Sequence, residues 1–144
     1  YNLGAQNIPR VKRTFRLLLI CCVSGSFLIW LLCMTAPGAV AAIFTNDAAL
    51  IAYTIRSMRI YLAALLIYGV QVACQYSFVA LDQVPKAIFL TIWRKIILLI
   101  PLIFLLPHLW SDAVMGVYLA EPIADTIAVC ITAPMFYVYY RKLK

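Results

Sequence analysis

The sequence has few charged residues and very few acidic ones. Of its 144 residues 12% are charged, five are acidic and one is histidine, whereas 66% are hydrophobic. A soluble domain of this length is usually about half apolar and about a quarter charged, so the composition excludes an ordinary soluble domain. Because long apolar runs cross a bilayer as helices, the composition predicts an all-α integral membrane protein. No stretch shows the alternation of polar and apolar residues that is typical of membrane barrels.

The residue sets that carry enzyme chemistry are also missing. The single histidine, His108, falls in a predicted loop at residues 107–112, so it completes no Ser/His/Asp set. The sequence has no zinc-ligand spacing, no glycine-rich phosphate loop and no histidine pair. The five cysteines lie inside apolar runs, where cysteine is typically a small buried side chain. We therefore expect neither an enzyme nor a resident metal or cofactor.

Long apolar runs are abundant, and they predict four transmembrane helices. Each is about 20 residues or longer, enough to cross a hydrocarbon core of roughly 30 Å. The expected spans are residues 17–44, 60–81, 87–106 and 115–138, within one bundle domain that covers residues 17–144. Pro37 and Gly38 predict a break in the first span, and residues 45–47 predict a helix N-cap. The helical segment 48–59 is expected to lie along the membrane interface.

Basic residues flank the apolar runs mainly on one side of the predicted bundle. Residues 1–16 carry four basic residues and no acid, which fits a segment lying on an anionic cytoplasmic surface. Four spans return the chain to the side where it began, so both termini share that side. The termini side would hold Arg10, Lys12, Arg13, Arg16, Lys86, Arg141, Lys142 and Lys144, and the other side would hold Arg56 and Arg59. This asymmetry predicts cytoplasmic termini, and it explains the net charge of +7 without a nucleic-acid partner.

Two carboxylates, Glu121 and Asp125, lie inside the last apolar run and share one helix face. Carboxylates in hydrocarbon are costly, so they mark a candidate functional site. At about 1.5 Å per residue, Asp125 would lie near the membrane midplane, level with Gln71. Arg94 would lie level with Gln75, about 5 Å nearer the cytoplasm. We therefore expect Asp125 to pair with Arg94, and Glu121, roughly 10 Å from the Arg94 level, to be out of reach. All five side chains are candidates for a substrate or ion pathway.

The polar side chains also have structural interpretations. Arg94 and Lys95 could snorkel back to the cytoplasmic headgroups along their apolar stems. Gln71 and Gln75 could be hydrogen-bonding partners between helices. The sequence leaves these alternatives open.

Three prolines inside the last two spans are a second indication of a functional site. They are Pro101, Pro122 and Pro134. Each removes one helical hydrogen bond and frees the carbonyl four residues earlier. Freed carbonyls beside a carboxylate form cation sites in the broken helices of transporters. The same prolines could instead only bend the spans for packing.

Several stretches, in order, resemble the multidrug and toxic compound extrusion (MATE) transporters. The segment after that family's eighth helix is similar to Y-N-L-G-A at residues 1–5 followed by R-V-K-R at 10–13. The tenth-to-eleventh helix region is similar to F-V-A-L at 78–81 followed by W-R-K-I-I-L-L-I-P-L at 93–102. The start of the twelfth helix is similar to G-V-Y-L-A-E-P-I-A-D at 116–125. Asp82 stands where the family usually has glycine.

The resemblance implies a twelve-helix antiporter built from two six-helix lobes, to which this chain supplies helices nine to twelve of the second lobe. Such proteins export organic cations or other amphiphiles against entering Na⁺ or H⁺. The implied partners are the lipid bilayer, the N-terminal lobe and small amphiphilic substrates, and the implied location is the bacterial cytoplasmic membrane. Because the sequence does not begin with Met, we expect a fragment or a processed piece.

Three other functions remain open at this point. A related flippase for lipid-linked saccharides would be expected to line a large cavity with several basic residues, but only Arg94 and Lys95 lie at depth here. A complete four-helix transporter of the small multidrug resistance type needs a glutamate in its first span, and residues 17–44 contain no charged residue. A non-transport structural subunit would use Asp125 and Arg94 as a buried clamp.

Overall fold

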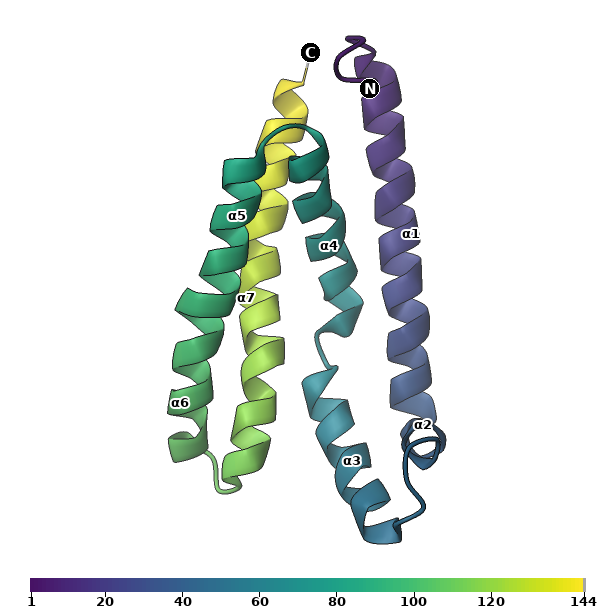
Figure 1. Ribbon diagram of the computed structural model, residues 1–144, viewed down its shortest axis with the longest axis vertical. Coiled ribbons are helices and arrows are strands. Elements are labelled where there is room, and N and C mark those ends of the chain that lie inside the picture. Colours follow the sequence, from purple (N-terminus) through teal and green to yellow (C-terminus); the bar gives the residue numbers. More distant parts are fainter. Residues whose placement is uncertain (144) are drawn as a thin grey trace.

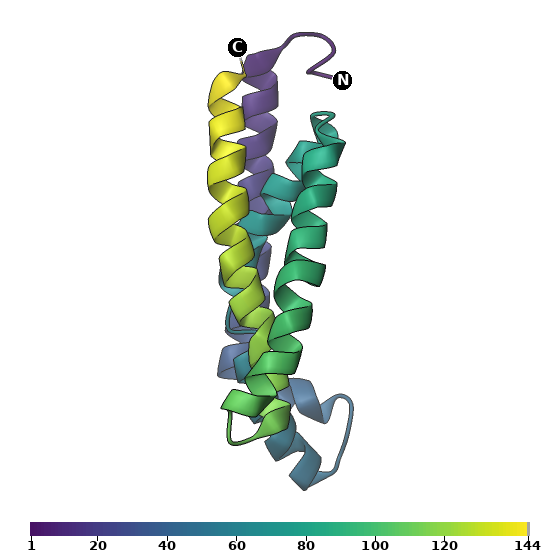
Figure 2. The same ribbon diagram turned by 90° about the vertical axis from the view of Figure 1, so that its left-hand side faces the viewer.

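The computed structural model describes residues 1–143, and it is helical, without strands, over that range. The elements are α1 (Ile8–Thr35), α2 (Pro37–Ala42), α3 (Ala48–Tyr61), α4 (Leu65–Ala80), α5 (Val84–Ile92), the π-helical segment η1 (Trp93–Leu99), α6 (Ile100–Leu109) and α7 (Ala113–Lys142). They form an elongated bundle with both termini at the same end (Figure 1). The side view shows α6 close beside α7 and the run α5–η1–α6 diverging from α7 toward the end that holds the termini (Figure 2). The predicted all-α fold class is confirmed.

Three helical runs are each long and apolar enough to cross a membrane: α1, the run Val84–Leu109, and α7. Helices α3 and α4 pass the same test together, although they are bent by 50° at a short break. Counted as one broken span, this pair gives the fourth predicted crossing. Many large apolar side chains on the outside of the bundle are exposed, as expected of a lipid-facing surface.

The break between α3 and α4 differs from the predicted unbroken span at 60–81. Residues 62–64 form tight turns in which Ala63 N–H donates to Ile60 and Leu65 N–H donates to Leu62. Beyond the break α3 packs against α2 and α7, so it belongs to the bundle. Neither proline nor glycine marks the break, and the apolar pattern runs through it. The prediction of a single uninterrupted helix is therefore wrong.

Other helix ends follow local signals in the sequence. Asp47 caps α3 by accepting hydrogen bonds from the N–H groups of Ala49 and Leu50, as the predicted N-cap requires. Helix α1 ends before Ala36, and Pro37 opens α2, so the predicted break is confirmed. Helix α1 begins at Ile8, so the basic residues 10–16 lie on the same helix as the first span.

The third span is longer than predicted at both ends. It begins at Val84 because Pro85 fits the first helical turn, where its missing N–H is not needed. It continues to Leu109 through Pro107, so the predicted loop at 107–112 starts too early. His108 is exposed on the last turn of α6, with Nδ1 2.8 Å from the Phe104 carbonyl oxygen.

The turn between α4 and α5 explains why Asp82 stands at a position where the family usually has glycine. Asp82 has a φ of 58°, in the left-handed region that favours glycine. Aspartate is one of the few other residues that adopt this conformation readily. Gln83 N–H then donates to the Phe78 carbonyl at 2.8 Å, which closes the turn.

Helix α7 is the central helix and contacts α3, α4, η1 and α6. Small residues recur at every fourth position of its buried face, namely Gly116, Ala120, Ala124, Ala128 and Thr132. Such a stripe lets helix backbones approach closely in a membrane. A Cβ added at Gly116 would lie 2.9 Å from the Leu106 carbonyl oxygen, which shows how close α6 comes. Near the termini the stripe ends at Phe136, whose ring packs 5.0 Å from that of Phe78.

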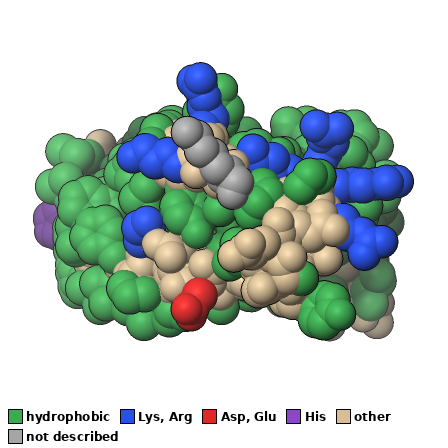
Figure 3. Space-filling model, turned by 90° about the horizontal axis from the view of Figure 1, so that it is seen from above, with side chains coloured by type: hydrophobic (Ala, Val, Ile, Leu, Met, Phe, Trp, Pro, Cys, Tyr) green, Lys and Arg blue, Asp and Glu red, His purple; other side chains and the backbone are tan. Residues whose placement is uncertain are grey.

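Lysine and arginine gather at the end of the bundle that holds both termini (Figure 3). Residues 10–16 lie on the first turns of α1, Lys86 on the first turn of α5, and Arg141 and Lys142 on the last turn of α7. Arg56 and Arg59 lie on α3, toward the opposite end. Lys144, which was counted with the basic residues, lies outside the described residues. The predicted clustering of basic residues therefore holds over the described chain.

Candidate functional site

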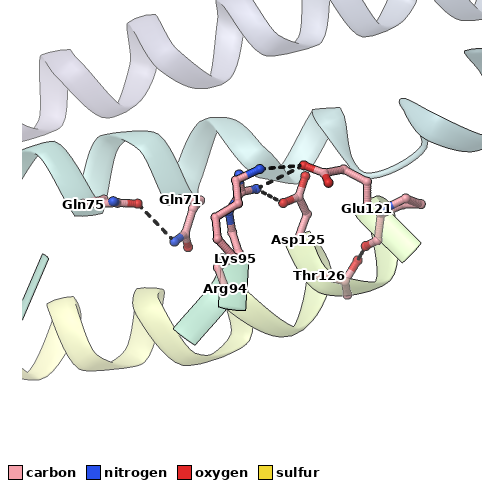
Figure 4. A network of polar contacts seen from close by, with 8 residues as sticks. Gln71, Gln75, Arg94, Lys95, Glu121, Asp125 and Thr126 are labelled. Atoms are coloured by element: carbon pink, nitrogen blue, oxygen red, sulfur yellow. Dashed lines mark hydrogen bonds and ion pairs between the residues drawn. The ribbon is translucent and has the colours of Figure 1, made fainter. Parts of the chain in front are cut away.

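Four charged side chains meet inside the bundle where η1 faces α7 (Figure 4). Arg94 Nη1 donates to Asp125 Oδ1 and lies 3.7 Å from Glu121 Oε1. Lys95 Nζ lies 3.3 Å from the same Glu121 oxygen. The side chains of Arg94 and Asp125 are each 11% exposed and that of Glu121 is 16% exposed, whereas that of Lys95 is 48% exposed. Two positive and two negative charges thus share one mostly buried site.

The π-helical geometry of η1 brings two adjacent basic residues to one partner. A π-helix has i→i+5 hydrogen bonds and hence more residues per turn, so neighbouring side chains point in more similar directions than in an α-helix. Figure 4 shows Arg94 and Lys95 reaching toward the same carboxylates. On α7, Glu121 and Asp125 are one helical turn apart and so present both carboxylates on one face.

Aromatic side chains surround the charged network. The guanidinium carbon of Arg94 lies 4.9 Å from the centre of the Tyr68 ring on α4, a cation–π distance. The Tyr61 ring lies edge-on to Tyr118, with centroids 6.1 Å apart. A pocket of about 160 Å³ opens beside the network and lies next to the break at 62–64. It is lined by Tyr61, Leu62, Leu65, Tyr68, Arg94, Glu121 and Asp125.

The structure forms the expected Arg94–Asp125 pair, but the expectation that Glu121 is out of reach is wrong. The third span begins three residues earlier than predicted, which places Arg94 about 4.5 Å farther from the end that holds the termini. Glu121 is only one turn, about 6 Å, from Asp125, and an arginine side chain can cover that distance. Snorkelling of Arg94 and Lys95 is also contradicted, because both head groups turn to the carboxylates of α7.

The two glutamines lie beside the charged network without hydrogen bonding to it. Gln71 Nε2 donates to Gln75 Oε1 at 3.5 Å, and Gln75 Nε2 donates to Thr91 Oγ1 on α5. Gln75 therefore links α4 to α5, in agreement with the interpretation of glutamine as an interhelical partner. Gln71 is 1% exposed, and its Oε1 has no hydrogen-bond partner within residues 1–143.

The three prolines do not break the helices that contain them, although a broken helix was one of the two interpretations of their positions. Pro101 lies directly after η1 and inside the continuous helical run Val84–Leu109, so it does not end that helix. Pro122 and Pro134 lie inside α7, which continues from Ala113 to Lys142. Beside the first of them, the Thr126 hydroxyl donates to the Pro122 carbonyl at 2.7 Å. Of the two alternatives, the continuous α7 favours prolines that leave the helix unbroken at Pro122 and Pro134.

Sequence reasoning missed three members of the site: Lys95 as the partner of Glu121, Tyr68 as the partner of Arg94, and Thr91 as the partner of Gln75. A signal for Lys95 was present, because two adjacent cations face two carboxylates spaced one turn apart. No sequence pattern singled out Tyr68. Among residues 1–143 no three His, Cys, Asp or Glu side chains converge as a metal site would need.

Comparison with known proteins relates this chain to a transporter. No protein-family model matches the chain, and no curated protein matches it. Among solved structures, the chain is similar to the MATE multidrug transporter DinF-BH, with 31% sequence identity and a TM-score of 0.86. The match covers 96% of this chain and 30% of that transporter, and a second solved chain, described as protein A, matches with the same values. The chain is therefore identified as a portion of a MATE-family transporter, as its sequence motifs predicted.

Proposed function

We propose that this chain is part of a secondary active multidrug exporter that exchanges organic cations or other amphiphiles for entering Na⁺ or H⁺. The observation that carries the proposal is the structural match to a MATE multidrug transporter, which covers 96% of the chain. Because the match covers 30% of that transporter, the activity would belong to a longer protein that also contains the N-terminal lobe. In this assignment the chain corresponds to helices nine to twelve, and the protein is a transporter, not an enzyme.

The charged network between η1 and α7 supports a role in transport. Ionisable side chains inside membrane spans are costly, and they commonly lie on substrate or ion pathways. Asp125 serves to hold Arg94, since the two form a direct buried ion pair. Glu121 is the better candidate for a transported cation or a proton, because one of its two cationic partners is half-exposed. Gln71 and Gln75 would extend the pathway along α4 toward the end that holds the termini.

We further propose that the protein is a multi-pass protein of a bacterial cytoplasmic membrane, with both termini in the cytoplasm. The gathering of lysine and arginine at the end that holds the termini supports this orientation (Figure 3). The same orientation places the α4–α5 turn, with Lys86, in the cytoplasm and the α6–α7 turn outside.

Export measurements on the full-length transporter test the proposed function. Glu121→Gln should strongly reduce export of a cationic dye while the protein reaches the membrane in normal amounts, because the variant keeps the side-chain shape and removes the charge. Asp82→Asn is the matched control, since Asp82 lies in the α4–α5 turn and asparagine also tolerates its positive φ. Normal export in both Glu121→Gln and Asp125→Asn would contradict a role of the network in transport.

A structural clamp is a second candidate role for part of the network. The observation in its favour is the direct ion pair between Arg94 and Asp125, buried between η1 and α7. If the pair acts only as a clamp, Asp125→Asn should lower the amount of folded protein, and the folded fraction should export normally. Glu121→Gln should then have no effect on export.

A further inference from the structure

We propose that Glu121 binds the positively charged head group of an organic ammonium ion in the adjacent pocket, and that Lys95 pairs with the Glu121 carboxylate when no such ion is bound. The inference rests on the proposed export function. It adds the residue that binds the head group and a residue of the chain that competes with the ligand.

The charges of the network account for one exchangeable cation. With Lys95 in place, Arg94 and Lys95 neutralise Glu121 and Asp125. When Lys95 moves away, Arg94 alone faces both carboxylates, so one negative charge of the mostly buried site is uncompensated. An uncompensated buried charge is strongly unfavourable, so the site then favours binding of one monovalent cation.

The contacts of the two basic residues show which of them can leave. Arg94 is buried, donates to Asp125, lies near Glu121 and rests on the Tyr68 ring, so three partners fix it. Lys95 has a single polar contact, 3.3 Å from Glu121, and is half-exposed. Its flexible four-carbon stem lets the ammonium group move to solvent or headgroups without disturbing the helix.

The walls of the pocket favour an organic cation over a bare metal ion. Tyr61 presents an aromatic ring, a group that recognises ammonium ions, and Leu62 and Leu65 present apolar surface. A small hard cation needs several oxygen ligands, whereas Asp125 here is already engaged by Arg94. The volume of about 160 Å³ equals roughly five water molecules, enough for a small head group. A drug-sized body, which needs about 300 Å³ or more, would extend beyond this pocket.

Calorimetric titration of the purified full-length transporter with tetramethylammonium chloride tests the proposal. If Lys95 occupies the site about nine-tenths of the time, Lys95→Gln should bind tetramethylammonium roughly tenfold more tightly than the unmodified protein. Lys95→Arg retains the competing charge and should bind with the original affinity. Adding Glu121→Gln to Lys95→Gln should abolish binding. Lys86→Gln is the matched control at the basic end, where Lys86 contacts Gln83 and the Tyr139 ring, and it should change nothing.

Three results would overturn the proposal. Affinity that stays the same or falls in Lys95→Gln would show that Lys95 does not compete. Absence of tetramethylammonium binding in both the unmodified protein and Lys95→Gln would show that the pocket is not an ammonium site. Displacement of tetramethylammonium by equal concentrations of Na⁺ would assign Glu121 to an inorganic ion instead. Export that depends on Glu121 but is accompanied by any of these results would leave the proposed function intact and reject only this inference.

Discussion

Removing the charge of Asp125 should destabilise the bundle measurably. Loss of one partner of a buried ion pair typically costs about 3–5 kcal/mol, because the other charge stays buried without compensation. Arg94 and Asp125 are both buried here, so this range applies. Glu121 Oε1 remains 3.7 Å from Arg94 and offsets part of the loss. We therefore expect Asp125→Asn to lower the free energy of unfolding by about 3 kcal/mol, the lower end of that range.

A double-mutant cycle isolates the pair itself. Arg94→Gln should also destabilise the protein, since it leaves two carboxylates without their shared arginine. In the double variant neither charge is present, so the two losses should not add, and the coupling should be about 2 kcal/mol. Denaturant unfolding of the full-length protein in detergent micelles, followed by circular dichroism, provides the measurement.

Matched single variants show whether the effect comes from the ion pair. Asp82→Asn and Arg13→Gln make the same chemical changes at positions where no ion pair is found among residues 1–143. Each should change stability by less than about 0.5 kcal/mol, as is usual for surface substitutions. Losses from Asp125→Asn and Arg94→Gln that add to within about 0.5 kcal/mol would refute the reasoning, because independent sites behave in that way.

Three further predictions concern packing, topology and independence. Gly69→Ala should destabilise the protein by about 1–3 kcal/mol, because its Cβ would lie 2.7 Å from the Cys22 carbonyl oxygen, whereas Gly25→Ala, with no neighbour within 4 Å, should not. Thermal unfolding of both variants compares them, and equal midpoints would contradict the close α1–α4 contact. In a cysteine-free background, external thiol reagents should label Asn46→Cys but not Gln83→Cys, and the reverse pattern would invert the topology. Residues 1–144 alone should not export a dye from vesicles, and export at the rate of a full-length relative would show that they suffice.

Much of the fold follows from local signals in the sequence. Apolar runs located the spans, Asp47 and Pro37 marked helix starts, and the lysine and arginine asymmetry identified the end that holds the termini. These features depend on a few neighbouring residues and on the cost of exposing polar backbone to lipid. The Arg94–Asp125 pair was also predictable, since counting residues along two helices was enough to place the two side chains within about 5 Å of each other in depth.

The remainder depends on how the helices meet. The break at 62–64 has no proline or glycine, and it lets α3 lean against α7. The π-helical segment η1 likewise has no marker before Pro101, yet it turns Lys95 toward Glu121. An error of three residues in the start of the third span was sufficient to misplace Arg94 relative to Glu121. Residue counting gives depth along one helix but not the rotation of that helix about its axis.

The π-helical segment also affects how α5 is rotated about the helix axis relative to α6. A π segment accommodates an extra residue, and one residue of an ordinary α-helix corresponds to a rotation of roughly 100° about the axis. If η1 reverted to α geometry with α6 held against Gly116 of α7, α5 would turn by about that angle. Thr91 would then swing away from Gln75, and the hydrogen bond between α4 and α5 would break. A change from π to α geometry beside Arg94 would therefore rotate the half-span that leads to the basic end.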